Sequence, residues 1–157
     1  MTPLEARTET ERMLEEHREL QKLVTDLRTF LKRPRPKLGD GGAHTWATSL
    51  AADLVTLHDR VFRHFREEER SGVLDDLCAL HPRAARAVTL LKDEHEEILT
   101  GFRTILRSVM TYSESKTPEI PHLRRRTWSI LEQLLCHECK ETDLFQRFIY
   151  EDLGTCD

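Results

Sequence analysis

Histidine and glutamate recur at helical spacing in two parts of the sequence. His64 precedes Glu68 by four residues, and His137 precedes Glu141 by the same interval. Because four residues are slightly more than one helical turn, both side chains of a pair leave the same helix face, one turn apart. Imidazole nitrogens and carboxylate oxygens are common metal ligands in proteins. The two pairs therefore predict a metal site if their helices face one another.

Two single histidines extend this pattern into a repeat. One lies upstream of each pair, so the order His, then His-x-x-x-Glu, occurs twice along the chain. The candidate ligands are His17, His64, Glu68, His95, His137 and Glu141. Four imidazoles and two carboxylates offer about eight donor atoms, enough for two ions that share the carboxylates. With a solvent-derived bridge and open positions, such mixed nitrogen and oxygen sites suit iron or manganese. A structural zinc ion prefers a closed tetrahedron of four ligands and would leave two of these groups without a metal.

Four long segments carry these residues, and each has the hydrophobic spacing of a helix. Apolar residues recur at steps of three and four over residues 3–32, 43–70, 82–112 and 120–150, with glycines and prolines gathered mainly between them. Short connections between long helices favour antiparallel neighbours. We therefore predict an all-α fold in which residues 1–157 form a single domain, an antiparallel up-down four-helix bundle. Residues 72–80 are expected to add a short helical turn.

The candidate ligands occupy core-facing positions of these helices. In the last segment the core-facing positions read Leu134, His137, Glu141 and Leu144. A single histidine at such a position is usually a core residue that is hydrogen-bonded to a neighbour. Six ionisable groups in one layer are harder to explain in this way, because facing carboxylates repel each other and burial of unpaired charge is costly. Buried His–Glu ion pairs would stabilise the bundle no better than apolar residues, so a metal centre is the preferred interpretation.

The segments around these residues resemble a known family. "LEEHREL", "RHFREEE", "LKDEHEEI" and "CHECKETDLF", in this order on four helices, are similar to the hemerythrin-like domain of the HHE cation-binding type. The resemblance implies a hemerythrin-like bundle and a non-haem di-iron centre, in which two Fe ions are bridged by the two glutamates and an oxo or hydroxo group. It also implies that the six residues named above are the metal ligands.

Two positions depart from the oxygen-carrying members of that family. Those proteins have a second histidine one turn before the third-helix ligand, where this chain has Leu91. Their final motif spaces histidine and aspartate by five residues, whereas here Glu141 follows at plus four and Thr142 at plus five. The chain instead resembles the subset that includes iron–sulfur-cluster repair proteins and the iron-sensing domain of a ubiquitin-ligase subunit.

Several neighbouring residues have secondary roles in this interpretation. Some of the glutamates beside the ligands are expected to hydrogen-bond the outer imidazole nitrogens, although most face water. These glutamates are Glu67, Glu69, Glu94, Glu96 and Glu97. Cys136 and Cys139 bracket His137 but point away from the core, so the three cannot readily share an ion. His58 lies off the core-facing positions and is expected to pack between helices.

Two classes of function fit such a centre. In the first, the protein binds or senses O2 or another small diatomic molecule, iron itself or redox state, and a signalling partner protein reads the result. In the alternative, a di-iron redox protein acts on NO or peroxide, or donates iron for iron–sulfur cluster repair, with a protein redox partner as reductant. A third interpretation is a structural bundle whose site holds zinc or no metal. We favour the first.

Composition and charge exclude other classes. The net charge is −4, with acidic and basic residues interspersed, which argues against a nucleic-acid surface. No stretch approaches the roughly 18 apolar residues of a membrane span, so no membrane partner is expected. The charged first residues lack the apolar run of a secretion signal. We therefore expect a cytoplasmic protein whose four cysteines are thiols.

Overall fold

The computed structural model describes residues 3–34, 41–114 and 119–147. Its helices are α1 (Pro3–Lys32), α2 (Gly42–Ser71), α3 (Val73–Leu80), the 3-10 turn η1 (Pro82–Ala84), α4 (Ala85–Glu114) and α5 (Ile120–Phe145). These described residues include no strand, which confirms the all-α prediction.

The predicted helix bounds agree with the observed ones to within a few residues. The third predicted segment, 82–112, begins as η1 and continues as α4. The turn expected near residues 72–80 is the helix α3. The last segment was predicted to reach residue 150; α5 ends at Phe145, and residues 148–150 lie outside the described residues.

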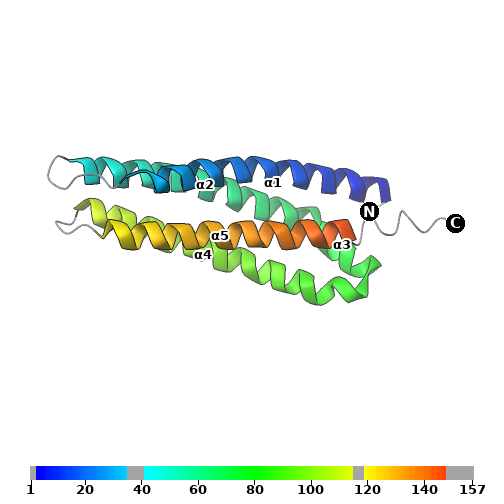
Figure 1. The fold of residues 1–157 in the computed structure, drawn as a ribbon. Coiled ribbons are helices and arrows are strands. Elements are labelled where there is room, and N and C mark those ends of the chain that lie inside the picture. The colour runs from blue at the N-terminus through cyan, green and yellow to red at the C-terminus, as the bar shows by residue number, and fades with distance from the viewer. Residues whose placement is uncertain (1–2, 35–40, 115–118, 148–157) are drawn as a thin grey trace.

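The four long helices lie side by side along a common axis (Figure 1). Each contacts two others, in the order α1, α2, α4, α5 and back to α1. The colour gradient in Figure 1 reverses from each long helix to the next, so successive helices run in opposite directions. All four helices therefore turn one face toward a shared interior.

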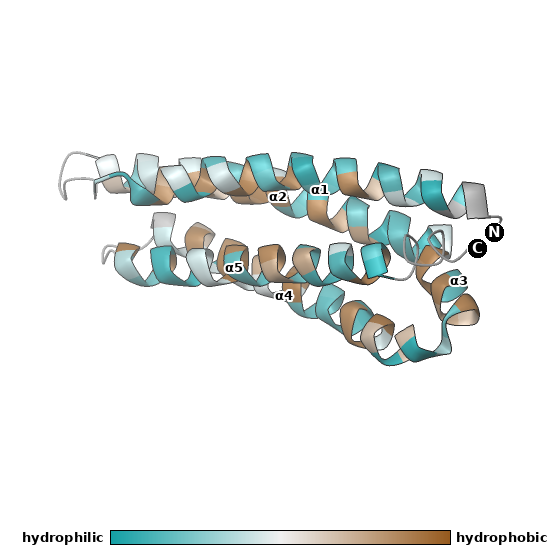
Figure 2. Cartoon of the chain, turned by 45° about the vertical axis from the view of Figure 1, so that its right-hand side comes forward, coloured by the Kyte–Doolittle hydropathy of each residue, from teal (hydrophilic) through white to brown (hydrophobic). Residues whose placement is uncertain are grey.

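Gly72 allows α2 and α3 to follow one another directly. Its φ is +73°, a left-handed conformation that other residues rarely adopt, so the chain changes direction there and immediately re-enters a helix. α3 packs on α2 and α4 and buries Val73, Leu74 and Leu77. Figure 2 shows brown, apolar residues over much of α3. This short helix supplies apolar contacts where α2 ends, one turn beyond Glu68.

Two apolar clusters fill the interior and leave a polar layer between them. The larger cluster extends toward the connections at residues 34–41 and 114–119 and includes Leu20 and Leu134. The smaller lies at the α3 end and includes Met13 and Leu144. On α1, Met13 and Leu20 flank His17. On α5, Leu134 and Leu144 flank the His–Glu pair in the same way. The polar residues thus lie at one level of the bundle, enclosed by apolar side chains on both sides.

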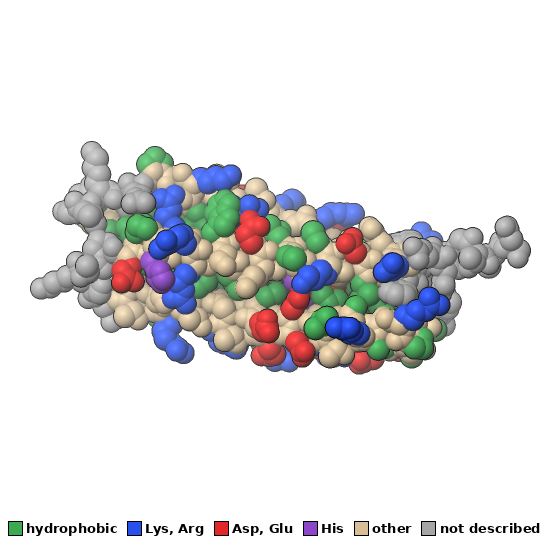
Figure 3. All heavy atoms as spheres, turned by 60° about the horizontal axis from the view of Figure 1, so that its bottom comes forward, with side chains coloured by type: hydrophobic (Ala, Val, Ile, Leu, Met, Phe, Trp, Pro, Cys, Tyr) green, Lys and Arg blue, Asp and Glu red, His purple; other side chains and the backbone are tan. Residues whose placement is uncertain are grey.

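Charged residues cover the outside of the bundle. Acidic and basic side chains are interspersed on the face shown in Figure 3. Within the described ranges, none of the helices combines the length and hydropathy needed to cross a membrane.

Candidate metal centre

All six predicted ligands meet in the polar layer. α1 and α4 each contribute one histidine, whereas α2 and α5 each contribute a histidine and a glutamate. Every one of these side chains is buried, with at most 3 % of its surface exposed. The core-facing assignment of His17, His64, Glu68, His95, His137 and Glu141 is therefore confirmed as a matter of geometry.

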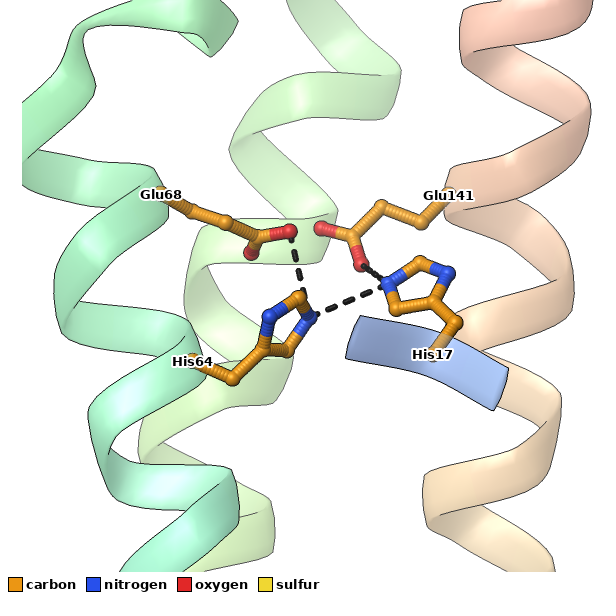
Figure 4. A group of neighbouring side chains, drawn as sticks. All are labelled: His17, His64, Glu68 and Glu141. Carbon is orange, nitrogen blue, oxygen red and sulfur yellow. Dashed lines mark hydrogen bonds and ion pairs between the residues drawn. The ribbon is translucent and has the colours of Figure 1, made fainter. Parts of the chain in front are cut away.

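One group of four residues can share a single ion. His17 Nε2 lies 3.0 Å from His64 Nε2 and 3.2 Å from Glu141 Oε2. Glu68 Oε1 lies 3.3 Å from His64 Nε2. Figure 4 shows these side chains converging from three helices. One ligand atom from each of the four residues lies within 4.8 Å of the other three, so this group can hold a metal ion.

A second group lies beside the first and shares a carboxylate with it. His95, His137 and Glu141 also bring one ligand atom each to within 4.8 Å of the others. Glu141 Oε1 is 3.7 Å from His95 Nε2, and Oε2 is 3.6 Å from His137 Nε2. Glu68 Oε2 reaches to 3.4 Å from His95 Nε2. Each glutamate therefore contacts histidines of both groups.

The outer nitrogen of each imidazole has its own partner. Three of the four partners are carboxylates, and the fourth is a hydroxyl group. The Nδ1 contacts are His64 with Glu16 at 2.8 Å, His95 with Glu69 at 3.2 Å, His137 with Glu94 at 3.0 Å and His17 with Thr142 at 3.3 Å. Because an ionised carboxylate only accepts, it keeps the proton on Nδ1 and leaves the Nε2 lone pair for the centre.

Sequence reasoning found only part of this outer set. It named Glu69 and Glu94 among five candidates; within the part of the chain that the structure describes, the other three make no hydrogen bond to these imidazoles. It missed Glu16 and did not give Thr142 this role. The sequence did contain a signal for these partners, because each of them is adjacent in sequence to a predicted ligand. Only the packing shows which neighbouring helix each partner faces.

The electrostatics of the buried carboxylates favour a bound cation. Burial raises the pKa of Glu68 well above its usual range, and the facing Glu141 raises it further. Burial also raises the pKa of Glu141, but the surrounding histidines, first of all His17, outweigh it and hold the pKa well below its usual range. Burial lowers the pKa of His95, yet Glu141 and Glu68 outweigh this and raise the pKa to about 10. In the metal-free protein a protonated His95 therefore supplies positive charge beside the ionised Glu141, while Glu68 stays protonated. A bound metal ion would replace these protons, so that both glutamates could ionise and His95 could offer its Nε2 lone pair.

The protonation state of His64 also favours a bound cation. Burial lowers the pKa of His64, while its hydrogen bond lowers the pKa of Glu16. A neutral His64 therefore donates its Nδ1–H to an ionised Glu16, and its Nε2 lone pair faces Nε2 of His17. Among the described residues, buried atoms without a hydrogen-bond partner include Nε2 of His95 and His137 and all four carboxylate oxygens of Glu68 and Glu141. Metal ions would use these lone pairs, so the residues present fit a metal centre.

Glu138 is a buried carboxylate that the sequence reasoning did not identify. It is fully buried and both oxygens lack a hydrogen-bond partner. Burial, with a contribution from Glu141, raises its pKa to about 8; Gln21 lies close enough to oppose this shift but not in hydrogen-bond geometry. Glu138 belongs to neither group of ligand atoms.

The remaining predicted positions behave as expected. His58 is half-buried, stacks on Phe62 and meets Phe102 edge-on, so it packs between helices. Cys136 and Cys139 are exposed free thiols that point away from the centre.

The arrangement as a whole is a buried His/Glu cluster that can hold a metal ion. Comparisons with protein-family models, curated proteins and solved structures found no match to this chain. The functional argument therefore depends on the side chains themselves.

Proposed function

We propose that this chain is a hemerythrin-like, non-haem di-iron protein that binds or senses O2 or another small diatomic molecule, iron itself or redox state. One observation carries the proposal: four imidazoles and two carboxylates from four helices converge in a buried layer, with most of their central lone pairs unpaired. Stability alone does not favour such a layer, because unpaired buried polar groups cost free energy that leucines would not.

The contacts favour two ions over one. A single ion held by His17, His64, Glu68 and Glu141 would satisfy a tetrahedral zinc site. It would also leave the central nitrogens of the other two histidines buried without a partner. Two ions that share the glutamates use all six residues. When bound, two iron ions supply open coordination positions and reversible one-electron changes.

The protein's own residues prepare the site for that role. The outer carboxylates orient the imidazoles, and the ring of Phe65 stacks on His95 at 4.0 Å between ring centroids. Apolar clusters enclose the layer on both sides along the bundle axis. Leu91 is buried in the smaller cluster and offers no donor where oxygen carriers resembling this chain have a histidine. This difference supports sensing or binding rather than oxygen carriage.

Metal loading tests the proposal directly. We expect the purified protein, loaded anaerobically with Fe2+, to retain two iron ions per chain by elemental analysis. His64→Ala and Glu141→Ala should lose iron. His58→Ala is the matched control, because it removes a histidine from the same helix outside the centre, and it should load normally. Retention of zinc but not iron, or unchanged iron in both site variants, would contradict the proposal.

Exposure of the loaded protein to O2 then separates the functional classes. A visible absorption band that appears with O2 and disappears on its removal supports reversible binding. Irreversible oxidation supports sensing of oxygen or redox state. Turnover of added NO or peroxide with a reductant would instead support the alternative, a di-iron redox protein.

A further inference from the structure

The outer contacts of the four histidines form a closed ring around the bundle. Each partner residue is adjacent in sequence to a ligand of its own helix and contacts a histidine on the next helix. The contacts run from Glu16 on α1 to α2, from Glu69 on α2 to α4, from Glu94 on α4 to α5 and from Thr142 on α5 back to α1. The ring follows the twofold repeat of the ligands, so its members can be compared pair by pair.

Thr142 is the member that breaks this repeat. Glu69 follows the ligand Glu68 by one residue, and Thr142 follows Glu141 in the same way. The repeat therefore places a hydroxyl group where its other copy has a carboxylate. A hydroxyl can either donate or accept, so Thr142 does not fix which nitrogen of His17 carries the proton. It also adds no negative charge to strengthen the imidazole as a donor.

The two groups of ligand atoms consequently differ in donor strength. Both histidines of the second group, His95 and His137, have carboxylates on Nδ1. In the first group only His64 does. Each of the three carboxylates is also ion-paired with a basic side chain, Glu16 with Arg12, Glu69 with Arg66 and Glu94 with Lys140. The difference between the groups is therefore the hydroxyl of Thr142 on His17. Outer partners of metal-binding histidines typically change metal affinity by about 10–100-fold. The first group should bind its ion more weakly by a factor in that range.

The second group is also more enclosed than the first, which again favours tighter binding there. Phe65 stacks on His95 at 4.0 Å and meets His137 edge-on at 5.1 Å, whereas its ring lies farther from His64 of the first group, at 5.8 Å between centroids. His64, in contrast, lines a cavity of about 380 Å³ between α1 and α2 whose other lining residues include Arg12 and Glu67. A polar, solvent-reached cavity beside the first group offers a route for exchange.

We propose that the position formed by His17 and His64 is the weaker and exchangeable one of two unequal metal positions, and that Thr142 is the positioning residue that makes it so. This inference rests on the proposed dinuclear centre. The His95 and His137 position holds its ion more tightly, fills first and loses its ion last.

Competition with a chromogenic ferrous chelator tests this inference on the 157-residue chain. Anaerobic titration of the metal-free chain with Fe2+ should give two dissociation constants that differ by about 10-fold or more. Thr142→Glu should tighten the weaker constant and narrow the gap, since Glu69 shows that a glutamate at this place reaches the imidazole. Thr142→Val should widen the gap. His17→Ala should retain one ion at the tight constant.

A reciprocal variant and its control complete the test. Glu69→Thr should weaken binding at the tight position, whereas Glu97→Thr, which changes an exposed glutamate two residues after His95 on α4, should leave both constants unchanged. Two equal constants in the wild type, or an unaltered gap in Thr142→Glu, would overturn the inference and leave the di-iron proposal standing. Failure of the wild type to bind iron at all would overturn both.

Discussion

Replacement of Glu68 by glutamine should have opposite effects on the metal-free and iron-loaded protein. In the metal-free protein, Glu68 is fully buried, faces Glu141 and has no hydrogen-bond partner on either oxygen. A glutamine amide in its place can donate to the Glu141 carboxylate without first taking up a proton, which Glu68 must do to remain buried beside Glu141. Because a buried polar group without a partner costs about 1–3 kcal/mol, we expect Glu68→Gln to raise the free energy of unfolding by about that amount.

Iron binding should reverse the order of stability of the wild type and Glu68→Gln. An ion that binds only the folded state stabilises it by about 4 kcal/mol when the free ion is about 1,000-fold above its dissociation constant. Glu68 contacts histidines of both metal positions, so the glutamine variant should lose most of that gain. The iron-loaded wild type should therefore be more stable than the iron-loaded variant.

Urea unfolding of both forms under anaerobic conditions measures the two effects. Glu138→Gln is the matched control, because it replaces another fully buried carboxyl group that lacks a hydrogen-bond partner and belongs to neither metal group. It should stabilise the metal-free protein and keep the iron-dependent gain. The reasoning is refuted if metal-free Glu68→Gln is less stable than the wild type, or if iron stabilises it as much as it stabilises the wild type.

Three further predictions concern the bundle around the site. The pKa of Glu138 is raised to about 8, so unfolding releases its proton and metal-free stability should fall as pH rises from about 4.5 toward 8; Glu138→Gln should flatten this dependence in urea titrations at several pH values. A Cβ at Gly101 would lie 2.5 Å from Ile130 Cδ1, so Gly101→Ala should overpack the core at a cost of about 1–3 kcal/mol. The gain in helix propensity offsets about 1 kcal/mol of this cost, and the melting temperature should fall. Adding Ile130→Val, which removes that methyl group, should restore the melting temperature. Leu77→Ala should cost about 2–5 kcal/mol of unfolding free energy, whereas Leu80→Ala on the same helix, with Leu80 66 % exposed, should cost under about 0.5 kcal/mol.

Much of the local structure followed from hydrophobic periodicity. Steps of three and four residues identify one face of each helix, and the residues predicted to face the core, among them His64 and Glu141, are buried in the structure. Glycine and proline positions gave the helix ends to within a few residues, because left-handed turns such as Gly72 need a residue without a Cβ. These features depend on interactions within a few residues along the chain, which a single sequence contains.

Contacts between helices were decided only by the tertiary packing. The sequence placed Glu16, Thr142 and Glu138 on helices but could not show which neighbour each meets, because that depends on the rotation and axial offset of a helix that is distant along the chain. Packing gave Glu16 and Thr142 imidazole partners and left the oxygens of Glu138 buried without one. The amino-acid sequence thus determined which side chains turn inward, and the alignment of the four helices decided which of them touch, since inward direction is a local property of a helix and contact is not.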